Sequence, residues 1–283
     1  FYGQDGFYSN DSEHLASTAS ELPTWRIIAS TTIGGALVGF LTYRFLPQKR
    51  PHGISDVIEA IALQGGRLSS RIGIMAAFTN ALSIGAGASV GREGPAVHLG
   101  ASLSSWIGRR LHLSRSLTRT LLGCGVAAAV AGSFNAPIAG ALFANEVVVG
   151  HYALKAFAPI VIASVASTAV SRIWFGDFPA FSMEIGIIQS FWEMPAFALL
   201  GLVSGGVAVI FMKSISIASS FAAYLTLPQW LKPALAGCIL GIAATFLPEI
   251  LGVGYEATEK AMLLQFSIWA LLQNYNSCDI EKI

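Results

Sequence analysis

The chain has 283 residues, of which 54% are hydrophobic and 12% charged, and its mean hydropathy is +0.62. A soluble domain carries about twice that share of charged residues. The net charge is only +1, and no basic patch with interleaved aromatic residues appears, so we expect no nucleic-acid partner. No nucleophile–base set, phosphate loop or metal-ligand spacing appears either, so we expect no enzyme, no cofactor and no metal site.

Uncharged runs recur along the chain, and a helix needs about 17–25 such residues to cross the hydrocarbon core of a membrane. These runs cover residues 27–43, 72–91, 120–145, 156–171, 194–212, 214–231 and 233–248. They are rich in Gly, Ala and Ser, which let membrane helices approach closely. The pattern predicts an all-α, polytopic membrane protein and disfavours a large soluble protein with buried helices.

Residues 1–24 are polar and lack the apolar core of a signal peptide. The chain begins with Phe, from which we expect a fragment or a gene model cut at its start. Between the later apolar runs, three segments look like abrupt helix starts. They are PHGISDVIEA at 51–60, GREGPAVHLG at 91–100 and SFNAPIAGALFANE at 133–146.

A helix start offers unpaired N–H groups and about half a positive charge, which together form an anion site. Starts that converge at membrane depth could hold a dehydrated anion more weakly than a lysine would, so the anion could leave again. Glu93 stands at such a start, directly after Arg92. Its carboxylate would compete with the anion when ionised and withdraw when protonated, which is a gate. The alternative is a structural Arg92–Glu93 pair that caps the helix.

These segments resemble the CLC family of chloride channels and chloride/proton exchangers. GREGPAVHLG matches a family signature with Glu93 as its gating glutamate, and GSFNAPIAGALFANE matches another helix of the same half. PHGISDVIEAI is similar to a third signature, though more weakly. The resemblance implies a homodimer with one pore per subunit, each subunit a bundle of two inverted halves of tilted and incomplete helices.

In that frame residues 25–176 form the first half and residues 177–269 begin the second. Residues 270–283 lose the apolar pattern, from which we expect a truncated second half that lacks a late family signature and a pore tyrosine. The resemblance also implies chloride as the transported ligand, a lipid bilayer as the surroundings and a multi-pass location in the plasma membrane.

The resemblance assigns residues to the anion pathway. The gate is Glu93, and the expected anion-binding residues are His52, Gly53, Ile54, Arg92, Glu93 and Gly94. His52 stands where the family has a central serine, so the preferred anion is open, and a mere capping role for His52 is the alternative. His98, on the same helix as Glu93, is expected to be a packed core residue.

Exchangers of the family carry an internal proton-accepting glutamate directly after the acid that aligns with Glu146. Here the next residue is Val147, as in the family's channels. We therefore expect passive, channel-like conduction. A chloride/proton antiporter, with Glu146 or His151 on the proton path, is one alternative, and a non-conducting truncated fragment is the other.

Overall fold

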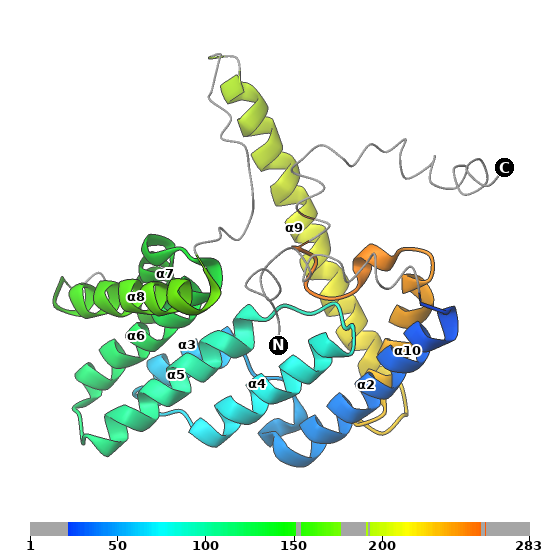
Figure 1. Cartoon of the computed structure of the whole chain (residues 1–283), viewed down its shortest axis with the longest axis horizontal. Helices are drawn as coiled ribbons and strands as arrows, with labels where there is room; N and C mark the ends of the chain where they lie inside the picture. The colour runs from blue at the N-terminus through cyan, green and yellow to red at the C-terminus, as the bar shows by residue number, and fades with distance from the viewer. Residues whose placement is uncertain (1–21, 151–153, 177–190, 192, 256–257, 259–283) are drawn as a thin grey trace. The chain divides into compact units, whose positions relative to one another are not determined.

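The computed structural model describes residues 22–150, 154–176, 191, 193–255 and 258, and every regular element in these ranges is helical (Figure 1). The α-helices are α2 (Thr24–Phe45), α3 (Ile54–Leu63), α4 (Ser70–Gly85), α5 (Glu93–Arg110), α6 (Arg115–Phe134), α7 (Pro137–Phe143), α8 (Leu154–Phe175), α9 (Glu193–Tyr224) and α10 (Lys232–Ala244). Two 3-10 turns, η1 (Pro47–Lys49) and η3 (Pro248–Ile250), and a π-helical turn, η2 (Ala144–Val149), join them. The all-α fold expected from the sequence is confirmed.

The chain forms two compact units, one of Phe1–Ser182 with Gln229–Ile283 and one of Met183–Pro228. The second unit contains α9, a single helix of 32 residues. It joins most of two runs that the sequence analysis treated separately, 194–212 and 214–231. Lys213 lies between these runs, and a lysine is a good helix former that does not interrupt the backbone hydrogen bonds.

Four described helices are long and apolar enough to cross a membrane, by length and composition. They are Thr24–Phe45, Arg115–Phe134, Ala156–Phe175 and Met194–Tyr224. Large apolar side chains stand exposed on them, such as Phe40, Ile162 and Ile173 at 54%, 69% and 80%. Outward-facing apolar side chains of this kind suit contact with lipid rather than water.

Two of the expected runs are broken. Run 72–91 is helical only to Gly85, after which Gly87 has a φ of +91°. Run 120–145 is interrupted where α6 ends at Phe134 and Asn135 adopts the left-handed conformation with φ 54°. Each break is followed by a new helix, α5 or α7. Non-helical backbone at membrane depth is tolerated only where it is buried in protein or lines a cavity.

A common core fixes where α3 and α5 begin. Val57 of α3, Val97 of α5, Leu122 of α6 and Ile160 of α8 are each at most 1% exposed and belong to one cluster. The first two side chains lie one turn inside their helices. The core therefore holds the starts of α3 and α5 in place.

Small residues bring α5 and α6 into direct backbone contact. A Cβ on Gly125 would overlap the Ser104 hydroxyl and the carbonyl oxygen of Gly100. Helices α5 and α6, which are neighbours in Figure 1, are therefore packed with their backbones in contact.

Gly125→Ala should destabilise the protein by about 1–3 kcal/mol, because its new methyl group would overlap the backbone of Gly100 as well as the Ser104 hydroxyl. The measurement is the thermal unfolding midpoint of the purified protein in detergent. Gly85→Ala is the matched control, since a Cβ at Gly85 meets nothing within 4 Å. Equal midpoints for the two variants would contradict the close packing of α5 on α6.

Candidate anion-binding site

The starts of α3 and α5 meet. A Cβ placed on Gly94, in the first turn of α5, would lie 3.7 Å from the Cα of Gly53, the N-cap of α3. The two helices therefore present their positive ends to one small region. Arg92 links this region to the third predicted start, because its Nη2 donates to the carbonyl of Ser133, four residues before Pro137 begins α7.

The backbone N–H groups at the two helix starts differ in whether they already have a hydrogen-bond acceptor. The Gly53 N–H donates to Asp56 Oδ2 at 2.9 Å, so this expected anion donor is already used within the protein. The first-turn N–H groups of Ile54, Glu93 and Gly94 have no acceptor within their own helices. These N–H groups, rather than that of Gly53, are the ones a small anion can use in this conformation.

His52 is buried, with 9% of its surface exposed, and is fixed by a carboxylate. Its Nδ1 lies 3.3 Å from Asp56 Oδ1, and Arg50 Nη2 donates to the same oxygen at 2.6 Å. Burial opposes the charge of Asp56, but the Gly53 N–H, His52 and Arg50 outweigh it and hold the pKa of this carboxyl below its ordinary value. Asp56 is therefore ionised at neutral pH and orients the imidazole of His52.

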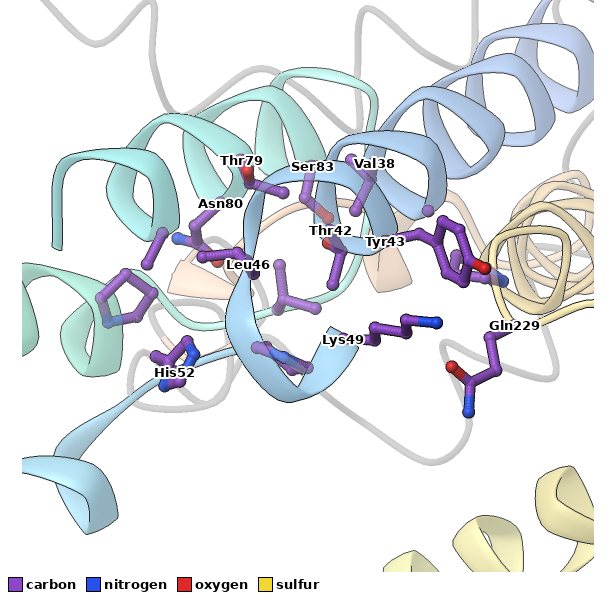
Figure 2. Close-up of a pocket in the computed structure, with 16 residues that line it drawn as sticks. Val38, Thr42, Tyr43, Leu46, Lys49, His52, Thr79, Asn80, Ser83 and Gln229 are labelled. Atoms are coloured by element: carbon purple, nitrogen blue, oxygen red, sulfur yellow. The ribbon is translucent and has the colours of Figure 1, made fainter. Parts of the chain in front are cut away.

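Two cavities in the first unit share His52. One has a volume of about 270 Å³ and is mainly apolar, and Figure 2 shows His52 at one end of it with Tyr43 and Gln229 toward the other. The other has a volume of about 510 Å³ and is lined by charged residues, among them Arg50 and Glu59. The His52 side chain therefore forms part of the wall of both cavities.

A serine on α5 shapes the charged cavity. Ser105 Oγ donates to the Gly66 carbonyl at 2.8 Å and accepts from the Leu68 N–H at 2.9 Å. Arg109 Nη1 donates to the Leu68 carbonyl at 2.6 Å. This network ties α5 to the connection between α3 and α4 and places the Arg109 guanidinium at the cavity wall.

Glu93 is half-buried and has a specific partner. The Tyr255 hydroxyl donates to Glu93 Oε1 at 3.1 Å, and the Arg92 guanidinium lies 5.0 Å above the Tyr255 ring. Burial raises the pKa of the Tyr255 phenol, as does Glu93, although Arg92 opposes the shift. The phenol therefore keeps its proton at neutral pH and can donate it to a carboxylate.

The proposed proton-path residues lie elsewhere on the chain. Glu146 is exposed on the π-helical turn η2, and Val147 beside it is 43% exposed. His151 lies outside the described residues. Asn145 is fully buried, and neither its Nδ2 nor its Oδ1 has a hydrogen-bond partner among the described residues. A π-turn with an unsatisfied amide is a feature that often marks functional segments.

Two residues that touch this region, Asp56 and Tyr255, are absent from the predicted site residues, and His98 is predicted only as a packed core residue. Asp56 stood in a recognisable helix start and could have been found as a capping acid at N3. Asn145 could have been flagged as an amide inside an apolar run. Tyr255 is 162 residues from Glu93 in the chain, and no local pattern connects them.

Comparison of the sequence and the fold with known proteins identifies a family. The sequence profile described as voltage gated chloride channel matches residues 34–274. The chain is 36% identical over 249 residues to a ClcB-like chloride channel protein of Ralstonia nicotianae, covering 86% of this chain and 57% of that protein. It is 27% identical over 258 residues to the voltage-gated ClC-type chloride channel ClcB of Escherichia coli, covering 90% of this chain and 61% of that protein. The chain thus spans about three fifths of the length of these relatives.

Solved structures share the fold. A slow cyanobacterial Cl⁻/H⁺ antiporter matches with a TM-score of 0.76 at 24% identity, over 92% of this chain and 63% of that one. A CLC-type fluoride/proton antiporter matches with a TM-score of 0.65 at 21% identity, over 91% of this chain and 72% of that one. With a family profile that matches most of its length and the fold of these transporters, the chain belongs to the voltage-gated chloride channel family, the CLC family that its motifs resemble.

Proposed function

We propose that this chain forms an anion pathway for chloride, in which the anion binds between the starts of α3 and α5 and Glu93 gates it. The observation that carries the proposal is the meeting of the two helix starts at Gly53 and Gly94, with a carboxylate beside them. Two half-positive helix ends attract a small anion without a full positive charge in contact with it. The anion can therefore both enter and leave.

Glu93 gates by competing with the anion. In the observed conformation the Tyr255 hydroxyl donates to the Glu93 carboxylate at the start of α5, and this hydrogen bond competes with the attraction of the carboxylate to the free N–H groups of the helix starts. An ionised Glu93 that leaves Tyr255 is drawn to the same N–H groups as chloride and excludes it. Protonation removes that competition, so acid favours the conducting state.

The proposed mode is passive conduction. The position after Glu146, where exchangers of the family carry a proton-accepting glutamate, is filled by the apolar Val147. A valine cannot accept a proton, so an internal relay through this position is interrupted. Coupled exchange for protons is the competing mode, since both solved relatives are antiporters by description.

The family and the composition also suggest a membrane location and an oligomeric state. We propose a multi-pass location in the plasma membrane and a homodimer with one pathway per subunit. The proposal needs no cofactor, no metal and no nucleic acid. Because the chain spans about three fifths of its relatives, chloride transport is proposed for the protein with all its pore-forming segments.

Glu93→Gln should raise chloride efflux from proteoliposomes at pH 7.5 roughly tenfold, the size of a change of about 1.4 kcal/mol in the gating equilibrium. The amide has the shape of the carboxylate but carries no charge to compete with chloride. The measurement is chloride efflux followed with an ion-selective electrode. Glu146→Gln is the matched control and should leave efflux unchanged; efflux of the Glu93→Gln protein at the wild-type rate would contradict the gate.

Tyr255→Phe should lower chloride efflux at pH 7.5 about tenfold or more, because a hydrogen bond to a charged group contributes about 1.5–3 kcal/mol and about 1.4 kcal/mol corresponds to a factor of ten. The phenyl ring still lies against the Arg92 guanidinium, so the change keeps this ring contact and removes the hydroxyl that donates to Glu93. In a Glu93→Gln background the same substitution should have little effect. An equal loss of efflux in both backgrounds would show that Tyr255 acts independently of Glu93.

Simultaneous recording of external pH during chloride efflux tests the mode. Passive conduction predicts no proton movement against its gradient when a chloride gradient is imposed. A fixed ratio of protons to chloride, abolished by Glu146→Gln, would establish exchange instead and would place Glu146 on the proton path.

A further inference from the structure

Two buried histidines, His52 and His98, face each other close to the start of α3. The ring centroids of His52 and His98 are 5.5 Å apart with an interplanar angle of 29°, and the two residues are 9% and 1% exposed. His98 lies on α5 just beyond Glu93 and lines the charged cavity together with His52. His98 is therefore buried in the core and also stacked on His52, which directly precedes the N-cap of α3.

Each ring has a nitrogen that nothing satisfies. His52 Nε2 and His98 Nδ1 are buried and have no hydrogen-bond partner among the described residues. A buried polar atom without a partner costs about 1–3 kcal/mol. Such atoms are rare in folded proteins and call for an unseen water, ion or ligand.

The contact with Asp56 decides which nitrogen of His52 carries a proton. An ionised carboxylate accepts hydrogen bonds only, so the Nδ1 that lies 3.3 Å from Asp56 Oδ1 is the protonated nitrogen. In the neutral ring Nε2 then presents a lone pair, which repels an anion. Only a second proton turns Nε2 into an N–H donor that can bind one.

We propose that His52 and His98 form a proton-linked anion site, in which the stacked pair takes up one proton together with the anion. This inference rests on the proposed function and adds its regulation. The proton converts His52 Nε2 into an anion ligand. Because two imidazolium rings at this distance repel each other, the pair holds one proton rather than two, and His98 sets the pH at which His52 accepts it.

The charges around the pair fit this arrangement. The titratable groups that line the two cavities around it are Lys49 of η1, Arg50 directly after η1, Asp56 and Glu59 on α3, Arg67 before α4 and Arg109 on α5. Tyr43 of α2 lines the apolar cavity on the other side of His52. Asp56 stabilises an imidazolium at Nδ1, and the basic residues of the charged cavity favour an anion at its wall.

A metal ion is a different occupant for two histidines and an aspartate. In the described ranges no three His, Cys, Asp or Glu groups are placed to hold one. Asp56 is also already occupied by Arg50 and the Gly53 N–H. An anion with a proton therefore fits the pair better than a cation.

The test is calorimetric titration of chloride into the purified Glu93→Gln protein in detergent, at pH 6 and pH 8. Two buffers of different ionisation enthalpy at each pH report the protons taken up per anion. Glu93→Gln removes the gating carboxylate, whose own protonation would otherwise contribute to the uptake. Linkage to one proton predicts uptake approaching one per chloride at the higher pH and an affinity that falls by up to about tenfold per pH unit.

Three further variants in the same background assign the proton. His52→Ser should retain chloride binding through the serine hydroxyl but lose most of the proton uptake and of the pH dependence. His98→Phe keeps a stacked ring without a charge and should shift the fall in affinity to higher pH. His112→Asn, at an exposed histidine with a φ of 51° that asparagine tolerates, should behave as the parent.

The outcomes of the titration distinguish failure of the proton-linked site from failure of the proposed function. Chloride that binds with the same affinity at pH 6 and pH 8, without proton uptake, would overturn the proton-linked site and leave the proposed function standing. No chloride binding at either pH in the folded Glu93→Gln protein would overturn the proposed function and this site with it. Proton uptake that persists unchanged in both His52→Ser and His98→Phe would also overturn the pair.

Discussion

The architecture depends on backbone N–H groups left without partners where two helices begin. A helix cannot satisfy its first N–H groups internally, and a lipid bilayer offers no water to do so. In this chain the starts of α3 and α5 come into van der Waals range of each other at Gly53 and Gly94. The N–H groups that lack an acceptor at these two helix starts are the same groups that we propose bind the anion.

Close packing of small residues keeps that feature in place. The contact of Gly100 with Gly125 brings α6 against α5, and the buried cluster around Val57 and Val97 pins both helices one turn beyond their starts. Asp56 then completes the start of α3 by accepting the Gly53 N–H and orienting His52. Each of these interactions limits how far the two starts can move apart.

Much of this arrangement could be predicted from local sequence. The all-helical membrane fold followed from repeated uncharged runs, and the starts at Ile54, Glu93 and Pro137 followed from Gly, Pro and acidic residues in the right order. The single helix α9 was not foreseen, because a lysine between two apolar runs was given more weight as a boundary than its helix propensity warrants. Contacts between distant residues, such as Tyr255 with Glu93 and His98 with His52, depend on tertiary packing and leave no local pattern.

The most direct test of the account is to locate the anion. Crystals of the Glu93→Gln protein grown in bromide at pH 6 should show an anomalous scattering peak between the starts of α3 and α5. We predict a peak within about 3.5 Å of the N–H groups of Ile54 or Gly94, the range of a hydrogen bond to a large anion. Bromide bound elsewhere, with no peak between these two helix starts, would contradict the central claim.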